Sequence, residues 1–411
     1  MNQTQQKYLG TSGLVVLIAL LSAFVPLSTD LYLPALPTMS SYFGVGADRI
    51  NLTLTAFFFF YALGTLVWGP LSDRYGRKPI LLIGLGLYVA ASILCALSWN
   101  IYGLVLFRIL QALGGSTAGV VSTAIVKDVY SGKKRESVLA IVQSMVTIAP
   151  AVAPVLGALL LKTLSWHGVF WTLTGTGIVA LAGSLFYEET IPQCTSGMFL
   201  QSLGRLGRVL QNRGFTMLLL LFSLGGLSMM AFIASSTYIY QDGFNLSVQV
   251  YSYYFSLNAL GSLTGPMIFL WLARRFHSEK IIQGGFIISA MSGLLVSLLG
   301  NLQPWIFALC MLPATVAGSC ARPPSANMML EQQKDDTGSV SSLMGSVGLL
   351  MGSLGMQLIA LPWGNTIIAL GIMIFSTAFF SLLVWPFVLK RVVRLPGPHA
   401  LNFPQSDPVD I

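Results

Sequence analysis

Two ionisable side chains, Asp30 and Arg108, lie deep inside long apolar stretches of this 411-residue chain. Nearly all of its other charged residues fall between such stretches. A charge inside a bilayer is costly, so an ionisable residue within a membrane span is a candidate functional group. A carboxyl group can gain and lose a proton, whereas an arginine stays charged and needs an acceptor. We therefore predict that Asp30 and Arg108 form the functional site of the chain.

The depths expected for the two residues agree. Asp30 lies roughly 24 Å into a hydrocarbon core about 30 Å thick, counted from Leu14. Arg108 lies roughly 9 Å past Tyr102 on a stretch that runs the other way. Both belong to the outer half of the bilayer and could share a polar network, and we expect burial to let Asp30 bind a proton. The alternatives are an Asp30 exposed at the outer interface and a structural Arg108 bonded to backbone carbonyls.

The composition indicates an all-α integral membrane protein. The chain is 55% hydrophobic and only 9% charged, whereas soluble domains carry about 25% charged residues. A membrane-spanning helix needs about 20 apolar residues, and a barrel strand only about 10 of alternating polarity. The sequence contains twelve stretches of helical length: 14–33, 51–71, 80–98, 102–125, 137–161, 169–187, 215–238, 251–272, 281–299, 304–322, 339–362 and 364–388.

The placement of basic residues predicts the orientation. The net charge is +8, and nearly all of the Lys and Arg residues fall in alternate loops and in the two ends of the chain. This bias is typical of cytoplasmic loops, so we expect both termini in the cytoplasm and no nucleic-acid partner. The first stretch has the features of a retained helix rather than a cleaved signal. Arg322, before two prolines, is expected to mark the inner end of the tenth helix.

A weak internal repeat divides the chain. The segment Ala62-Leu63-Gly64-Thr65-Leu66 is echoed by Ala259-Leu260-Gly261-Ser262-Leu263 in the second and eighth stretches. This position is what a duplication of six helices requires. We therefore expect two pseudo-symmetric six-helix bundles. The expected boundaries are residues 1–187 and 215–394 for the bundles, 188–214 for a central cytoplasmic loop and 395–411 for a polar tail.

The loop after the second stretch has an ordered set of glycines and charges. It reads Gly69-Pro70-Leu71-Ser72-Asp73-Arg74-Tyr75-Gly76-Arg77-Lys78. Glycines let helix ends approach closely, and an acid can accept from the N-terminus of a facing helix. The simpler interpretation is a short basic loop that only sets topology. The corresponding loop of the second half, 273–280, has no acid at the equivalent start.

Three further segments have distinctive patterns. The fourth stretch places Arg108 before Gln111 in Phe107-Arg108-Ile109-Leu110-Gln111-Ala112-Leu113-Gly114. The fifth contains Pro150, Pro154 and Gly157, which predict a kinked helix with close packing, although any proline-kinked helix would share this pattern. The first stretch ends with Asp30-Leu31-Tyr32-Leu33-Pro34-Ala35-Leu36-Pro37.

With these patterns together, the chain resembles the major facilitator superfamily, and within it the Bcr/CflA-type drug:proton antiporters. The resemblance implies the major facilitator fold and assigns a gate motif to Gly69, Asp73, Arg74, Gly76, Arg77 and Lys78. It also implies an antiporter motif at Pro150, Pro154 and Gly157, and coupling of protons to substrate by Asp30 and Arg108. Ala112, Ala153 and Ala158 replace glycines that are usual in the family, and Ser22 stands where some relatives carry a second acid.

These features predict a proton-coupled multidrug exporter of the bacterial inner membrane. It would work as a monomer by alternating access, with small and largely apolar substrates, protons and the bilayer as its partners. Tyr61, Gln111 and Asn258 are candidate residues of the substrate cavity. We expect no enzyme activity, cofactor, disulfide or metal site, since no nucleophile–base set, phosphate loop or metal-ligand spacing occurs. The alternatives are a dedicated exporter of a metabolite, such as a siderophore or nucleoside, and a membrane sensor that does not transport.

Overall fold

The computed structural model describes residues 6, 8–191, 199–333 and 337–393. Within these ranges the chain is entirely helical and contains 12 segments long and apolar enough to span a membrane. The first span, Gly10–Phe43, consists of α1 (Gly10–Ser22), α2 (Phe24–Asp30), η1 (Leu33–Ala35) and α3 (Leu36–Phe43). The other helices of the first half are α4 (Ala47–Tyr75), α5 (Arg77–Ala96), α6 (Ile101–Val129), α7 (Gly132–Thr163) and α8 (Trp166–Leu185). The second half contains α10 (Arg213–Tyr238), η2 (Ile239–Gly243), α11 (Val248–Leu272), α12 (Ser278–Leu299), α13 (Pro304–Glu331), α14 (Thr337–Ile359) and α15 (Thr366–Val393).

Local sequence sets the ends of several helices. Asn100 caps α6 by accepting from the backbone N–H of Gly103 at 2.7 Å, and Asn212 caps α10 in the same way. Gly44 ends α3 with a left-handed φ of 63°, a conformation in which glycine avoids a steric penalty. These signals fix where the chain turns between spans.

Prolines break the first span near its distal end. Pro26, Pro34 and Pro37 fall in α2, η1 and α3. Because proline lacks an N–H, each interrupts the helical hydrogen-bond ladder. The backbone is therefore irregular around Asp30, the last residue of α2.

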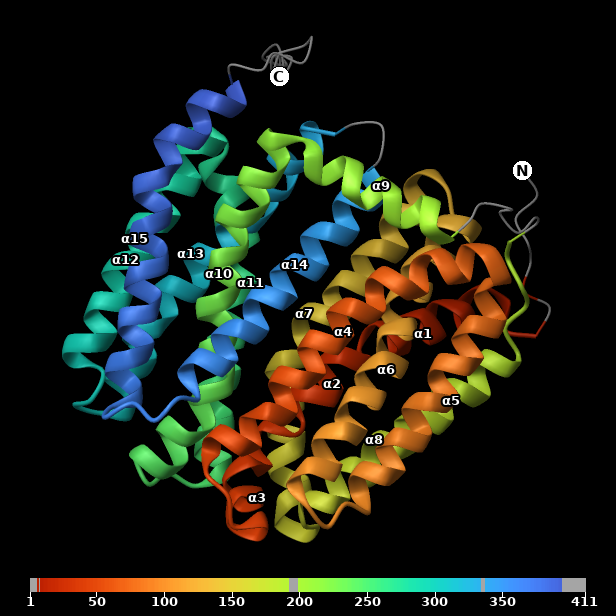
Figure 1. Cartoon of the computed structure of the whole chain (residues 1–411), viewed down its shortest axis with the longest axis horizontal. Helices are drawn as coiled ribbons and strands as arrows, with labels where there is room; N and C mark the ends of the chain where they lie inside the picture. The colour runs from red at the N-terminus through yellow and green to blue at the C-terminus, as the bar shows by residue number, and fades with distance from the viewer. Residues whose placement is uncertain (1–5, 7, 192–198, 334–336, 394–411) are drawn as a thin grey trace, which may run out of the picture.

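The helices associate in two sets, which we call the first half (α1–α8) and the second half (α10–α15). Most contacts lie within each set, and the sets meet mainly where α4 packs on α14 and α7 packs on α11. Figure 1 shows α14 lying beside α4 along this boundary. We call the boundary the seam.

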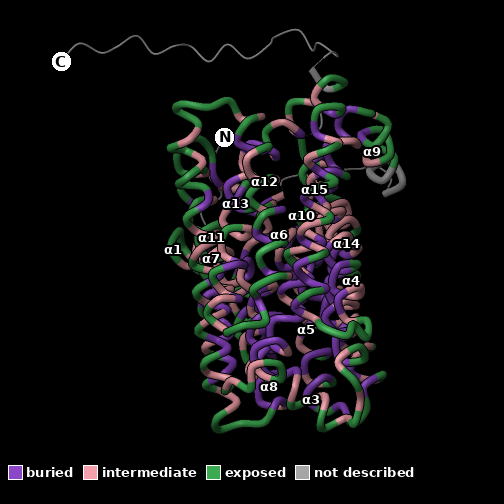
Figure 2. The backbone as a smooth tube through the Cα atoms, turned by 90° about the vertical axis from the view of Figure 1, so that its left-hand side faces the viewer, coloured by how far each residue is buried: buried purple, intermediate pink, exposed green. Residues whose placement is uncertain are grey.

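The bundle has two distinct ends. Figures 1 and 2 show the C-terminal end of α15 and the helix α9 (Phe199–Gln211) at one end, called proximal here, and α3 at the other, called distal. The helix α9 lies inside the predicted central loop, and it contacts α10 and α14 of the second half and α4 of the first. Val209 of α9 is buried in the proximal core of the second half. The sequence analysis did not predict this helix.

The two halves repeat the same close helix contacts. A Cβ on Gly157 of α7 would lie 2.2 Å from the carbonyl oxygen of Leu31, and one on Gly355 of α14 would lie 2.1 Å from that of Leu227. In both cases a helix passes so near a backbone that only glycine fits without a shift. The recurrence of this contact in corresponding helices supports a duplicated origin.

Candidate functional site

The side chain of Asp30 is buried at the end of α2. The residue is 6% exposed, and Thr29 donates a hydrogen bond from Oγ1 to its Oδ1 at 3.2 Å. In the part of the chain that the structure describes, no cationic group lies within 4 Å of this carboxyl group. Burying a carboxylate without a cation is costly, so Asp30 does not have the environment of an interfacial residue.

Arg108 is fully enclosed in the first half. It is 0% exposed, and its Nη1 donates to the carbonyl oxygen of Ser28 at 3.0 Å and to Oε1 of Gln111 at 2.6 Å. The rings of Phe57, Tyr32 and Phe170 surround the guanidinium, with centroids 4.3, 4.9 and 5.8 Å from Cζ. These rings supply cation–π stabilisation in place of water.

Two donor atoms of Arg108 remain without a partner. Nε and Nη2 are buried and donate to no acceptor among the described residues. A buried unpaired donor costs about 1–3 kcal/mol, so such a group calls for an explanation. Arg108 binds the carbonyl of Ser28, two residues before Asp30, but not Asp30 itself. In this state Arg108 therefore contacts the backbone of α2, the helix that carries Asp30, and forms no direct ion pair with Asp30.

The predicted antiporter motif lies against the same segment. Gly157 meets the carbonyl of Leu31, the residue after Asp30, and α7 packs along α2. Pro154 and Gly157 are buried. The structure therefore places Gly157 of this motif directly beside the candidate proton site, which the sequence spacing alone did not predict.

The same motif forms the distal part of the seam. Side chains of α11 donate to backbone oxygens of α7: Ser256 to Ala151 at 2.5 Å, Ser252 to Pro154 at 3.0 Å and Gln249 to Ala158 at 3.5 Å. Toward the proximal end, the face of α7 that carries Ala151 and Pro154 continues through Gln143 and Ser144, which are exposed. Along α7 and α11 the halves therefore contact each other distally and separate toward the proximal end.

Three residues of the predicted gate motif, Asp73, Arg77 and Lys78, belong to a compact cluster at the proximal end of the first half. Arg77 pairs with Asp73 and donates from Nε to Asp128 at 2.9 Å. Lys78 donates its backbone N–H to Glu189 at 2.9 Å and its amine to the carbonyl of Leu185 at 2.8 Å. The cluster ties the α4–α5 loop to the end of α6 and to the segment after α8.

Gly76 is required by this geometry. Its φ is 99°, and a Cβ would lie 2.6 Å from Oε2 of Glu189. Its neighbour Arg74 instead lies on the ring of Tyr75, 5.2 Å from the ring centroid. Gly69, by contrast, would meet only Val120 at 3.7 Å, so its space does not demand glycine.

Arg322 is a third charge within the spans. The prediction that it marks the inner end of the tenth helix is wrong, because α13 continues to Glu331. Prolines are tolerated inside membrane helices, so Pro323 and Pro324 do not stop it. Arg322 lies about 13 Å inside the proximal end of α13, is exposed, and donates from Nη2 to the sulfur of Met229 at 2.8 Å.

The three predicted cavity residues lie in different surroundings. Gln111 is fully buried and bridges Arg108 to Ser92, to whose Oγ it donates at 2.8 Å. Gln111 therefore supports Arg108 and faces no open space in this state. Tyr61 is 6% exposed within the core, and Asn258 accepts from Thr315 at 3.0 Å. The three side chains have different neighbours, and their place in a substrate cavity stays a prediction.

The described residues contain no cluster of His, Cys, Asp and Glu that could hold a metal ion. Cys95, Cys310 and Cys320 are free, and Cys194 lies outside the described residues. The polar groups of the site are thus the side chains described above.

Curated proteins with similar sequences include an MFS-type transporter and two resistance proteins. The uncharacterized MFS-type transporter YdgK of Bacillus subtilis is 30% identical over 91% of this chain and 94% of its own length. A chloramphenicol resistance protein of Pseudomonas aeruginosa is 40% identical over 45% of this chain and 46% of its own. A bicyclomycin resistance protein homolog of Haemophilus influenzae is 24% identical over 97% of this chain and 100% of its own.

A solved structure and a family comparison agree with this relationship. A bacterial homolog of the human lysosomal transporter Spinster, in an inward-facing and unoccupied conformation, has a TM-score of 0.68 at 16% identity. The match covers 93% of this chain and 95% of that one. Residues 18–356 match the Major Facilitator Superfamily. The predicted fold is confirmed, and the chain belongs to this superfamily of membrane transporters.

Proposed function

We propose that this transporter is a proton-coupled antiporter that exports small, largely apolar compounds by alternating access. The observation that carries the proposal is the buried carboxyl group of Asp30, which has no cation partner and lies where α2 packs on α7. The related resistance proteins support export of antibiotics or similar compounds as the activity. Asp30 would carry the proton, because burial disfavours the charged form of a carboxyl group and so favours proton binding.

Arg108 would couple the proton to the substrate. Its Nη1 binds the backbone of α2 at Ser28, while Nε and Nη2 lack partners in this state. When Asp30 loses its proton, the carboxylate gains affinity for these free donors. A shift of α2 toward Arg108 would then change the packing of α7 and the seam.

The state described here corresponds to one side of the transport cycle. The basic loops favour a cytoplasmic location for both termini and for the proximal end, in a bacterial inner membrane. With that orientation, the distal contacts between α7 and α11 close the outer side and the protein is open to the cytoplasm. Arg322, exposed on α13 about 13 Å from the proximal end, would lie on the substrate path. We propose a monomer as the functional unit, with 1–187 and 215–394 as its two moving parts.

Asp30→Asn tests the function directly. In inverted membrane vesicles that carry the full-length protein, a pH-sensitive dye reports proton movement when a substrate such as chloramphenicol is added. We expect Asp30→Asn to abolish substrate-driven proton movement, whereas Asp242→Asn, at an exposed acid of the second half, leaves it unchanged. Full export by the Asp30→Asn variant would refute the assignment, and substrate binding without any proton movement in the unmodified protein would favour a sensor.

A further inference from the structure

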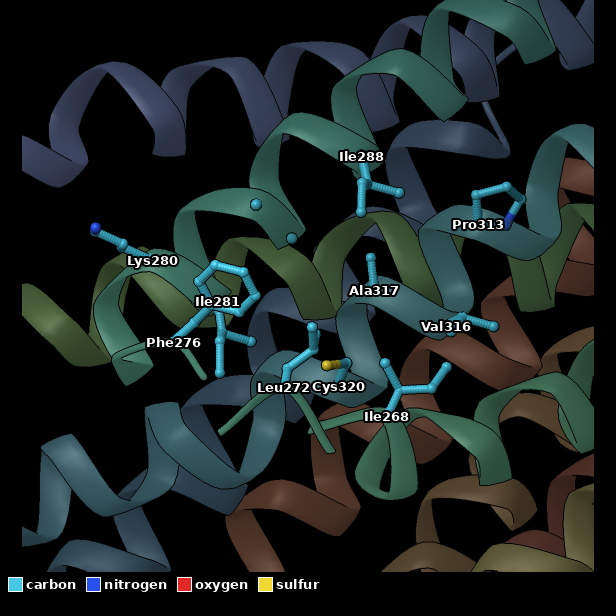
Figure 3. Close-up of a pocket in the computed structure, with 12 residues that line it drawn as sticks. Ile268, Leu272, Phe276, Lys280, Ile281, Ile288, Pro313, Val316, Ala317 and Cys320 are labelled. Atoms are coloured by element: carbon cyan, nitrogen blue, oxygen red, sulfur yellow. The ribbon is translucent and has the colours of Figure 1, made fainter. Parts of the chain in front are cut away.

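An apolar fissure opens in the second half between α11 and α12, with α13 as its floor (Figure 3). Its volume is about 570 Å³, within the range of roughly 300–1,000 Å³ that is usual for small-molecule sites. Six of its apolar lining residues matter here: Ile268, Leu272, Ile281, Ile288, Val316 and Cys320. Arg322 follows Cys320 by two residues and so points about 200° away around α13. The fissure is therefore separate from the site described above.

Two glycines leave the fissure empty of side chains. A Cβ on Gly284 would meet nothing within 4 Å, and one on Gly285 would touch α13 only at an ordinary distance of 3.6 Å. Both α11 and α12 pack on α13, but they make few contacts with each other. In the first half, α4 and α5 do contact each other, and a Cβ on Gly84 of α5 would lie 2.1 Å from Thr117. The fissure is thus a feature of the second half.

The charge near the fissure lies at one end. Figure 3 shows Lys280 at one end of the row of apolar side chains, with its amine directed away from them. Lys280 is the third residue of α12, so it lies at the proximal surface of the bundle, and Arg274 and Arg275 precede it in the same connection. Within the described ranges none of these three cations has a carboxylate within 4 Å. The fissure therefore combines a cationic mouth with an apolar interior.

We propose that the fissure binds one acyl chain of an anionic phospholipid, with the lipid phosphate at Lys280. The apolar lining matches a hydrocarbon chain and excludes a polar ligand. From Lys280 to Ile288 the fissure follows α12 for about 12 Å, along the direction of acyl chains in a bilayer. Basic side chains beside gaps between membrane helices favour anionic headgroups. The charge thus selects the headgroup, and Gly284 makes room for the chain.

Native mass spectrometry of the full-length protein tests this proposal. The protein in mild detergent is titrated with phosphatidylglycerol and with phosphatidylcholine of identical acyl chains. We expect phosphatidylglycerol to bind more tightly, and Lys280→Gln to weaken that binding about fivefold while binding of phosphatidylcholine stays the same. Gly284→Leu should weaken both lipids, because the leucine fills the fissure. The matched controls are Lys390→Gln and Gly86→Leu, which lie away from the fissure.

Cysteine labelling gives a second measurement that needs no variant in the fissure. Cys320 lines it, whereas Cys310 does not. Bound phosphatidylglycerol should slow the reaction of Cys320 with a membrane-permeant maleimide and leave that of Cys310 unchanged. Melting temperatures of the variants then separate a loss of binding from a loss of folding.

Three outcomes would overturn the proposal. Equal binding of the two lipids would remove the role of Lys280, and competition by inorganic phosphate alone would indicate a simple anion site. A dimer that Gly284→Leu dissociates would identify a second copy of the chain as the occupant. None of these outcomes depends on transport, so the lipid site can fail while the proposed function stands, and the reverse also holds.

Discussion

Asp30 and Arg108 in the first half are enclosed by side chains, whereas Arg322 in the second half is exposed on its helix. The same contrast holds at the proximal loops. Arg77 of the first half pairs with two acids, while Arg275 in the corresponding loop of the second lies on the ring of Trp271, 5.6 Å from the ring centroid. A charge that packing surrounds can transmit a change of protonation to the backbone. An exposed charge can meet a ligand instead, so the two halves are suited to different tasks.

The largest effect should come from exchanging lysine for the two span arginines. Arg108→Lys loses the planar guanidinium that binds Ser28 and Gln111 between aromatic rings, and we expect export to fall about 100-fold, or roughly 3 kcal/mol. Arg322→Lys keeps the charge at an exposed position and should lower export less than about threefold. Initial rates of export in vesicles measure both. Equal losses would show that the contrast between the halves has no functional meaning.

The loop arginines should differ in their effect on stability. Arg77→Gln removes charged hydrogen bonds to Asp73 and Asp128 and should lower the free energy of unfolding by about 1.5–3 kcal/mol. Arg275 has no carboxylate partner among the residues that the structure describes, so Arg275→Gln should change it by less than about 0.5 kcal/mol. Thermal unfolding in detergent compares the two variants. A larger loss of stability for Arg275→Gln than for Arg77→Gln would contradict the view that the ion pairs of Arg77 stabilise the first loop more than any contact of Arg275 stabilises the second.

The paired glycines separate packing from function. Gly157→Ala and Gly355→Ala each force a helix away from a carbonyl oxygen, so both should destabilise the fold by about 1–3 kcal/mol. Only Gly157 lies beside Asp30, so only its substitution should reduce proton movement beyond what the lower protein level explains. The measurement is dye response per folded molecule. Similar responses in both variants would remove α7 from the coupling path.

The smallest effect concerns a hydrogen bond across the seam. The hydroxyl of Thr65 lies 2.9 Å from that of Ser346 in the second half. Its repeat counterpart Ser262 donates to the carbonyl of Ala259 in its own helix and to no other described residue. Thr65→Ala should shift the balance between the two states by about 1 kcal/mol, or roughly fivefold. Ser262→Ala should leave it unchanged. Distances between spin labels across the proximal end report how much of the protein is in each state. An equal shift in both variants would show that the hydrogen bond between Thr65 and Ser346 does not set this balance.

Hydropathy and motifs predicted the fold, but side-chain detail required the structure. The apolar stretches predicted all 12 spans found in the described part of the chain, because a span needs a long run of apolar residues whatever its packing. Depth counting placed Asp30 and Arg108 at similar levels but could not tell that Arg108 binds Ser28 and Gln111. Such contacts depend on side-chain rotamers and on the neighbouring helices, and residue spacing along one helix does not reveal either.

Two errors have clear physical causes. The tenth helix was ended at Arg322 because two prolines follow it, although packed membrane helices accommodate proline. The amphipathic helix Phe199–Gln211 was missed because its apolar residues are spaced along one face and form no continuous stretch. A test for helical periodicity in polar segments would have found it.

Every side-chain hydrogen bond described at the distal seam runs the same way. The donors belong to Gln249, Ser252 and Ser256 of the second half, and the acceptors are peptide oxygens of the first. A backbone carbonyl oxygen is present whatever side chain its residue carries. The first half can therefore change its sequence here during evolution and still be recognised, while the second half must keep its polar side chains to hold the distal side closed.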